Sequence, residues 1–257
     1  KDIDKLYDFS YLIKNFYTVD SKTAAGSELL NVDNFLNTDL KIDKSIDGPK
    51  VLIFHTHSYE TYFDSKDESE GVLGVGELLK QELENVYGIE TYHYTSGLRD
   101  IGGSVNTAYE DIEPPVREIL EQNPSIQVVI DLHRDGIDVK EGAPIRKFVT
   151  EIDGQPVAQI MFFNGLSILN EDGVAKEITS LPNPYLDTNL AMSFNMQLMA
   201  NELFPGFTRK MYLKTYRYSL HMMPKSLLIE VGANTNTKEE AFNTAKPLAE
   251  ILANVID

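Results

Sequence analysis

The feature that most constrains the fold is a run of four consecutive apolar residues, Val51-Leu52-Ile53-Phe54, followed after a loop by a helix-like segment. An uninterrupted apolar run is typical of a strand that is buried on both faces of a sheet. The helix-like segment, Gly71 to Tyr87, has leucines and valines at helical spacing and is followed by Gly88, a residue that commonly stops helices. Such an alternation favours a parallel sheet covered by helices.

The alternation continues along the chain. We expect further strands at residues 89–94, 126–130, 145–152, 157–163, 209–213 and 226–231, and helices at residues 106–122 and 186–204. The strands at 145–152 and 157–163 flank Asp153-Gly154, a dipeptide typical of a tight hairpin turn. The segments together predict an α/β fold with a mostly parallel sheet flanked by helices.

Two local signals concern helix breaks and helix starts. Pro114-Pro115 lies inside the helix expected at 106–122 and should kink or divide it, because proline lacks the backbone N–H that a helix uses. Thr237 and Glu240 are spaced as the N-cap and N3 residues of a capping box. We therefore expect a final helix that ends at about Ile256.

The N-terminal region differs in character from the rest of the chain. Residues 1–48 are polar and mixed, with a short amphipathic stretch from Tyr7 to Phe16. We interpret them as a partly helical N-terminal extension that packs on the α/β domain, residues 49–257. No apolar run approaches the roughly 20 residues that a membrane span needs. The chain begins at a lysine, which fits a processed protein whose anchor or signal has been removed.

Composition excludes several kinds of site and partner. The chain has 257 residues and a net charge of −17, which disfavours nucleic acid and anionic membrane surfaces, since both are bound through Lys and Arg. It has no cysteine, so disulfides, thiolate metal sites and cysteine nucleophiles are excluded. Any metal must therefore be held by the carboxylates and the five histidines.

Chemically capable side chains follow three predicted strands at the point where each strand ends. The strand at 51–54 runs into His55-Thr56-His57-Ser58-Tyr59-Glu60, the strand at 126–130 into Asp131-Leu132-His133, and the strand at 226–229 into Glu230. In open α/β sheets, sites form beyond the carboxyl ends of the strands. We therefore expect these side chains to meet at one edge of the sheet.

The residue types match a zinc hydrolase. Such enzymes need three His or carboxylate ligands, a position left for water, and a further carboxylate that takes the proton of that water. His57 and Glu60 supply two ligands in one turn, and His133 supplies the third. Glu230 is then the general base. An open site made of His and Glu suits zinc better than other divalent ions.

Several neighbouring residues leave alternatives open. His55 lies two residues before His57, on the same side of an extended strand, and is an alternative metal ligand. Asp131 either orients the imidazole of His133 or caps a nearby turn. Arg134 either pairs with Asp135 at the surface or holds a substrate carboxylate. His221 either lines the cleft and stabilises an oxyanion or is an ordinary loop residue.

The strand-end segments resemble a known family, stage II sporulation protein P. The resemblance covers residues 50 to 256 and is specific in the combination of its motifs. It rests on five segments: Val51 to Tyr62, Ile130 to Asp135, Leu228 to Gly232, Pro205-Gly206-Phe207-Thr208-Arg209, and Asn236 to Ala241.

The resemblance implies a zinc amidase-like fold, of the phosphorylase/hydrolase-like type, and a Zn²⁺-dependent N-acetylmuramoyl-L-alanine amidase with endopeptidase activity. Such a protein degrades peptidoglycan during forespore engulfment. It works with stage II sporulation protein D, a lytic transglycosylase, and with stage II sporulation protein M. The full-length protein is then extracytoplasmic and membrane-anchored at the sporulation septum. The zinc-amidase order of ligands and base is His57, Glu60, His133, Glu230.

Two departures from the related zinc amidases matter. Those enzymes place the ligand Glu well after the first His, at the start of the next helix, which makes Glu70 the reserve ligand here. The loop before Glu230 usually reads Tyr-Asn-Gln-Asp in the family, whereas this chain has Tyr218-Ser219-Leu220-His221. That difference puts any inherited role of the loop in doubt. Because stem peptides carry carboxylates, Arg134, Arg209 and Arg217 are candidates for binding them; the alternative for each is a pair with a surface acid.

Two other functions compete with the amidase. A zinc carboxypeptidase-like peptidase shares the ligand order but releases single terminal amino acids. A non-catalytic scaffold binds peptidoglycan without cleaving it, but it has no need to keep three ligands and a base.

Overall fold

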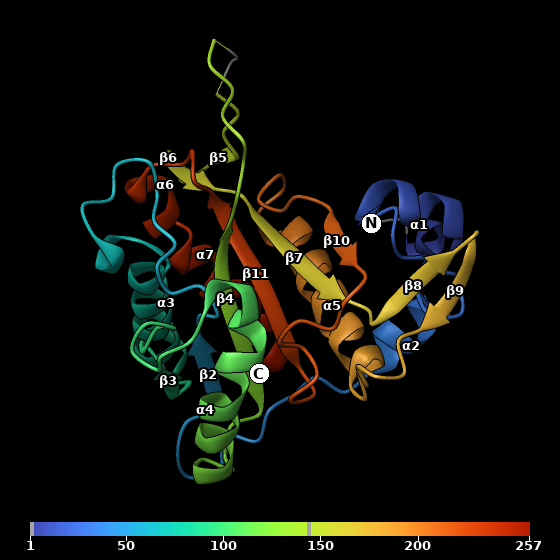
Figure 1. Ribbon diagram of the computed structural model, residues 1–257, viewed down its shortest axis with the longest axis horizontal. Coiled ribbons are helices and arrows are strands. Elements are labelled where there is room, and N and C mark those ends of the chain that lie inside the picture. The colour runs from blue at the N-terminus through green and yellow to red at the C-terminus, as the bar shows by residue number, and fades with distance from the viewer. Residues whose placement is uncertain (1–2, 143–144) are drawn as a thin grey trace.

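A seven-stranded sheet forms the centre of the computed structural model, which describes residues 3–142 and 145–257 (Figure 1). The strand order is β1-β10-β7-β11-β4-β2-β3. In that order, the strands are β1 Tyr17–Val19, β10 Met211–Lys214, β7 Ile160–Gly165, β11 Ser226–Ala233, β4 Val128–Asp135, β2 Val51–Phe54 and β3 Thr91–His93. Two hairpins stand outside it: β5 Val149–Ile152 with β6 Gln155–Ala158, and β8 Ile168–Glu171 with β9 Val174–Glu177.

The helices occupy the segments between the strands. They are α1 Phe9–Phe16, α2 Val32–Asn37, α3 Val72–Tyr87, α4 Ala108–Gln122, α5 Leu186–Leu203, α6 Lys238–Phe242 and α7 Ala245–Ile256. Short 3-10 turns span Ile3–Tyr7, Glu68–Glu70 and Val105–Thr107. The predicted α/β fold with a mostly parallel sheet flanked by helices is confirmed. Within the described residues, no helix combines the length and apolar character that crossing a membrane requires.

The sheet consists of two halves that run in opposite directions. β3, β2, β4 and β11 are parallel to one another, and so are β7, β10 and β1. The two sets meet where β11 pairs with β7 in antiparallel register, with Glu230 opposite Met161. The carboxyl ends of β2, β4 and β11 therefore lie at the same edge of the sheet as the amino ends of β7 and β10.

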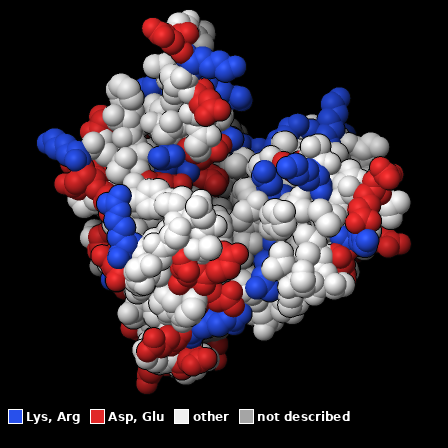
Figure 2. All heavy atoms as spheres, viewed as in Figure 1, with Lys and Arg blue, Asp and Glu red and all other residues white. Residues whose placement is uncertain are grey.

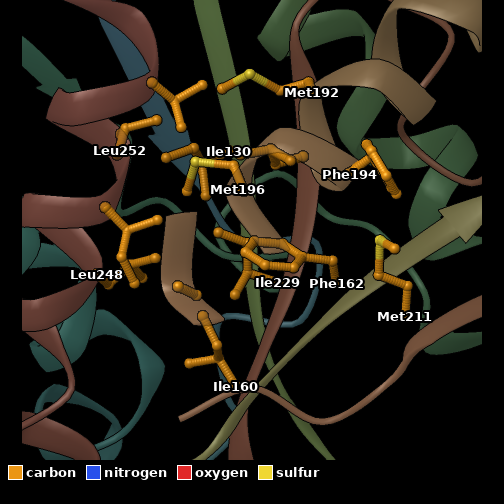
Figure 3. Packing of buried hydrophobic residues seen from close by; sticks show 14 of the residues in the cluster. Ile130, Ile160, Phe162, Met192, Phe194, Met196, Met211, Ile229, Leu248 and Leu252 are labelled. Carbon is orange, nitrogen blue, oxygen red and sulfur yellow. The ribbon is translucent and has the colours of Figure 1, made fainter. Parts of the chain in front are cut away.

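The two faces of the sheet are covered unequally. One face packs against α3, α5 and α7, with α2 packed in turn against α5, and the main core lies there (Figure 3). Ile130 of β4, Phe162 of β7 and Met211 of β10 all belong to this core. The other face is covered by α4 over β2 and β4, through a second cluster that joins Leu52 to Ile112. Over β7 and β10, that second face remains open.

The N-terminal segment is an integral part of the sheet and the core, whereas an appended extension would only pack on their surface. Its strand β1 is an edge strand of the central sheet, and Leu12 and Phe16 of α1 belong to the main core. Helix α2 packs against α5, where the carbonyl of Phe35 accepts a hydrogen bond from Asn195 at 2.8 Å. A domain boundary at residue 48 stays a prediction, but residues 17–19 complete the sheet rather than lie outside it.

Three local expectations need correction. Helix α4 is not divided at Pro114-Pro115, although a kink there stays a prediction; Pro114 is exposed, so water can satisfy carbonyls that proline leaves free. The expected last helix is two helices, α6 and α7, since Pro247 in the first turn of α7 has no N–H for the carbonyl of Asn243. Residues 157–163 form parts of two strands, β6 and β7, in different sheets. The capping box and the Asp153-Gly154 hairpin turn are confirmed.

Candidate active site

Side chains from three strand ends meet at the edge where β2, β4 and β11 finish. His133 of β4 and Glu230 of β11 are register partners in a parallel pair, so their side chains lie on the same face of the sheet. That face is the one covered by α4. His57 and Glu60 follow β2 directly, in a turn where the Glu60 N–H donates to the His57 carbonyl at 3.1 Å.

His57, Glu60 and His133 form a group that can hold a metal ion. Their candidate ligand atoms all lie within 4.8 Å of one another. Nδ1 of His57 is 3.6 Å from Oε1 of Glu60, and Nδ1 of His133 is 3.4 Å from Oε2 of Glu60. Two imidazole nitrogens and a carboxylate are the protein donor set of open zinc sites. The residues therefore fit the metal that the sequence suggests.

The backbone holds the carboxylate of this group in place. The N–H of Arg134 donates to Oε2 of Glu60 at 3.0 Å, so the strand that positions His133 also orients Glu60. The ring of Tyr109, on α4, stacks on His133 with ring centroids 6.3 Å apart and lies edge-on to His57 at 5.6 Å. The aromatic wall limits the directions from which a ligand can approach the two imidazoles.

Asp131 is the buried partner of His133. Its Oδ1 lies 2.7 Å from Nε2 of His133, which leaves Nδ1 of that ring facing Glu60. Three donors hold the carboxylate: the N–H and hydroxyl of Thr56, at 2.9 and 2.7 Å, and the hydroxyl of Ser219, at 2.6 Å. Of the two roles considered for Asp131, orienting the imidazole is the one that these contacts support.

The electrostatics of this pair follow from burial and mutual attraction. Burial opposes the charge on Asp131, but His133 and the hydrogen bonds from Ser219 and Thr56 outweigh it and lower the Asp131 pKa to about 2. Burial likewise opposes the charged imidazole, yet the carboxylates of Asp131 and Glu60 raise the pKa of His133 well above its usual value. The surroundings of Asp131 and His133 therefore favour a charged pair.

Glu230 lies beside the group, in surroundings that disfavour its charge. Burial, chiefly, raises the pKa of Glu230 to about 8. Among the described residues, its buried Oε2 has no hydrogen-bond partner. Glu230 is thus a buried carboxyl group beside a potential metal site, with one oxygen that accepts no hydrogen bond among the described residues. These are properties of a general base.

The two alternative ligands, His55 and Glu70, have other partners and lie outside the group of His57, Glu60 and His133. Both ring nitrogens of His55 have hydrogen-bond partners: Nδ1 lies 2.8 Å from the Leu132 carbonyl, and Nε2 lies 2.9 Å from Nε2 of His93. Glu70 pairs with Lys238 at 2.8 Å, at the start of α3. The short turn after β2 aims His57 and Glu60 at the sheet edge and takes His55 and Glu70 away from it.

The candidate substrate-binding residues divide between both sides of the group. Arg134 donates to the carbonyls of Thr61 and Asp135, so its side chain braces the loop rather than pairing with the Asp135 carboxylate. That carboxylate pairs instead with Arg209, at 2.8 Å. His221 lies on the other side, where Nε2 is 2.9 Å from Oε2 of Glu113. It lines a cavity of about 330 Å³ together with Tyr109 and Arg217.

Sequence reasoning missed Tyr109, Ser219 and Thr56 as parts of the site. Tyr109 lies at the first turn of a helix whose apolar spacing says nothing about His133. Ser219 belongs to the loop before β11, and its contact with Asp131 joins residues 88 positions apart. Only the Thr56 hydroxyl, between two histidines at a strand end, offered a local signal.

A comparison with protein families gives a match over nearly the whole chain. The model of stage II sporulation protein P (SpoIIP) matches residues 14–253. Stage II sporulation protein P of Bacillus subtilis (strain 168) is 23% identical over 225 residues, which cover 80% of this chain and 51% of that protein. The chain thus spans about half the length of this relative.

Solved structures of amidases share the arrangement only distantly. The N-acetylmuramoyl-L-alanine amidase from Clostridium difficile 630 has a TM-score of 0.46 at 14% identity, covering 81% of this chain and 95% of that chain. The amidase AmiC2 of Nostoc punctiforme has a TM-score of 0.44 at 13% identity, covering 81% and 96%. Likenesses this distant assign no activity to the chain.

Proposed function

Because the chain belongs to the stage II sporulation protein P family, we propose that it is a zinc-dependent peptidoglycan hydrolase of sporulation. The bond that we propose it cleaves is the amide between N-acetylmuramic acid and L-alanine, with stem-peptide cross-links as further substrates. The observation that supports this is the group of His57, Glu60 and His133, within 4.8 Å, with Glu230 beside it on the next strand.

Zn²⁺ would be held by His57, Glu60 and His133, where it would lower the pKa of a water towards about 7 and polarise the amide carbonyl. Asp131 keeps Nε2 of His133 engaged, so that Nδ1 stays available on the side of Glu60. Tyr109 shields the two imidazoles from solvent on one side. The protein thereby supplies orientation and a partly dry environment.

Glu230 moves the proton in this proposal. Its carboxylate takes a proton from the attacking water as the carbon–oxygen bond forms, and it returns that proton to the amide nitrogen as the carbon–nitrogen bond breaks. Burial, which raises the Glu230 pKa to about 8, suits a group that must accept and then donate near neutral pH. The products are a free lactyl carboxylate on the glycan and a peptide amine.

The biological setting is proposed from the family. The protein would act outside the cytoplasm at the sporulation septum, anchored to the membrane in its full-length form, during forespore engulfment. Stage II sporulation proteins D and M would be its partners. The D protein cuts glycan strands and the proposed activity strips their peptides, so the two reactions would complement each other.

The test is mass spectrometry of muropeptides after purified peptidoglycan is incubated with the zinc-loaded protein, with the chelated protein, and with the zinc-loaded Glu230→Gln variant. We expect peptide-free glycan from the zinc-loaded protein alone, and a fall of about 10²–10⁴-fold in rate for Glu230→Gln with its zinc content unchanged. Lys176→Gln, an exposed change on β9, is the matched control and should cleave normally.

The other outcomes point to different functions. Release of single terminal amino acids would favour the carboxypeptidase-like alternative. Intact peptidoglycan in every tube, with retained binding, would favour a scaffold. Activity of Glu230→Gln near that of the unchanged protein would remove Glu230 from the role of base.

A further inference from the structure

A second pocket adjoins the proposed metal group on the side of β10. It measures about 660 Å³ and lies over the open face of β7 and β10. Glu230 and Asp135 form its wall towards the metal group, and Met161, Phe163 and Tyr212 lie along its floor. Figure 2 shows this face of the molecule, where a hollow separates two lobes and basic side chains gather beside it.

The pocket is basic in a strongly acidic protein. Arg146, Arg209, Lys210 and Lys214 line it, against only two carboxylates, although the chain as a whole carries a net charge of −17. Among the described residues, neither Arg146 nor Lys210 has a carboxylate within ion-pair distance. Such a local reversal of charge is an electrostatic feature that attracts anions.

Arg209 is the most firmly held of the four. It pairs with Asp135 at 2.8 Å, and its guanidinium carbon lies 3.6 Å from the centroid of the Phe148 ring. The guanidinium of Arg146 lies over the same ring, at 4.9 Å. Among the described residues, Nη1 of Arg209 is buried without a hydrogen-bond partner. A buried donor without a partner is uncommon in native proteins and indicates that a ligand or water completes the site.

The position of Glu230 indicates which part of the substrate would occupy the pocket. Glu230 must return its proton to the nitrogen of the scissile amide, so the part of the substrate attached to that nitrogen lies on the Glu230 side. That part is the peptide, which bears the carboxylates. The cavity on the other side is lined by Glu110 and Glu113 together with Arg217 and His221, which both lie against Glu113, so it lacks the excess of basic groups found over β7 and β10.

We propose that the pocket over β7 and β10 binds the carboxylates of the stem peptide. The peptide is the leaving group and lies on the Glu230 side of the scissile amide. The pocket therefore sets the orientation in which the substrate binds. The proposal rests on the proposed hydrolase function for its direction, but the preference of the pocket for an anionic peptide can be measured without cleavage. Phe163 and Tyr212, which are partly exposed in the pocket, supply apolar surface for the body of the peptide.

The experiment measures binding of a soluble, N-acetylated stem peptide to the intact chain by calorimetry at low ionic strength. Chelator is present so that the acetyl amide stays intact. The probe is used with its carboxylates free and with the same carboxylates converted to amides. The test variant is Arg146→Gln/Lys210→Gln, because both residues are exposed and, in the described part of the chain, neither pairs with a carboxylate. Lys80→Gln/Lys176→Gln, which makes the same charge change on α3 and β9, is the matched control.

We expect the unchanged protein and the control to bind the free-acid peptide about 10-fold more tightly than the amidated peptide, with the advantage shrinking as salt is added. The test variant should lose most of that preference. Equal affinity for both peptides in the unchanged protein, or a preference that survives in the test variant, would overturn the proposal. If the double variant fails to fold, Lys210→Gln alone should still reduce the preference, since within the described residues its amine hydrogen-bonds to the Lys14 carbonyl and to no carboxylate.

The two proposals fail in different ways. Without cleavage of peptidoglycan, a retained preference for the free acid keeps the pocket as a peptide-carboxylate site and removes only the hydrolase. Cleavage without any preference keeps the hydrolase and removes the pocket.

Discussion

The two halves of the sheet differ in how they are covered. β2 and β4 are packed on both faces, by α3 and α7 on one side and by α4 on the other. β7 and β10 are packed by α5 on one face only, and their second face forms the floor of the basic pocket. The chemistry-bearing residues come chiefly from the doubly covered half and the pocket from the open half.

The difference shows how one edge of a sheet can serve two purposes. His133 and Asp131 stand on a strand that cannot shift without disturbing two packed layers, so their geometry is fixed before any ligand binds. The open half instead provides an accessible surface on which a ligand can bind. Because it runs in the opposite direction, its amino ends, with Arg209, lie beside the carboxyl end of β11, with Glu230.

The largest expected effect is on stability, in neighbouring residues of the two halves. Leu52→Ala and Ile53→Ala should each lower the free energy of unfolding by about 3 kcal/mol, since both are fully buried, on opposite faces of β2. On β10, Leu213→Ala should cost a similar amount, whereas Tyr212→Ala should cost about 1 kcal/mol or less. Urea denaturation measures all four. Equal losses for Tyr212 and Leu213 would show that the face over β10 is covered in solution.

This contrast is visible in the sequence. Val51 to Phe54 is continuously apolar, as a doubly covered strand requires, whereas Met211 to Lys214 alternates apolar and polar residues, as a strand with one open face does. The direction of β7 is not visible. Strand patterns have no polarity, and the run at 157–163 looks like one strand although the chain leaves the β5–β6 hairpin at Gln159 and enters another sheet. Only tertiary pairing with β11 decides that.

The next effect concerns Glu230 and pH, and it tests how dry the junction between the halves is. Burial raises the Glu230 pKa to about 8, above its value of 4.5 in the unfolded chain, so ionisation destabilises the fold increasingly as the pH rises through that interval. Glu230→Gln has no such penalty. In chelator, the stability of Glu230→Gln relative to the unchanged protein should therefore increase by about 3 kcal/mol between pH 5.5 and pH 8.5.

Urea unfolding of both proteins at the two pH values provides this measurement. Groups other than Glu230 titrate in both proteins and cancel in the comparison. A difference that stays constant with pH would mean that the carboxyl is solvated and that its pKa is ordinary, which would also weaken its assignment as the proton carrier.

The sequence predicts those residues of the candidate site that follow directly on a recognisable strand. His57, Glu60, His133 and Glu230 all follow apolar runs, and parallel strands bring such ends together. The choice of Glu60 over Glu70 depended on the shape of one turn, which spacing alone does not fix. Tyr109 belongs to α4, which covers the same face of the sheet, and no local sequence pattern in that helix points to a histidine.

A smaller effect should follow from changing Asp131, which tests the rigidity of the covered half. Asp131→Asn replaces a carboxylate that serves three donors and His133 with a group that has a single acceptor oxygen. We expect zinc affinity to fall about 10–100-fold, because the imidazole of His133 loses its fixed orientation. Competition with a chelating dye measures the affinity. Ser219→Ala, which removes one donor and keeps the charge, should change it less, and unchanged affinity in Asp131→Asn would leave Asp131 with a structural role alone.

The smallest expected effect lies in the open half of the sheet. It tests whether the basic residues of the pocket stabilise the fold. Lys214 pairs with Asp20 at 3.2 Å near the surface, with about a third of its side chain exposed. Lys214→Gln should lower the free energy of unfolding by less than about 1 kcal/mol, the usual worth of such a pair. Urea denaturation of this variant, next to Lys176→Gln on β9, makes the comparison. A much larger loss would give the basic residues of the pocket a structural reason to exist. A small one leaves ligand binding as the reason for gathering positive charge on the open face of an acidic protein.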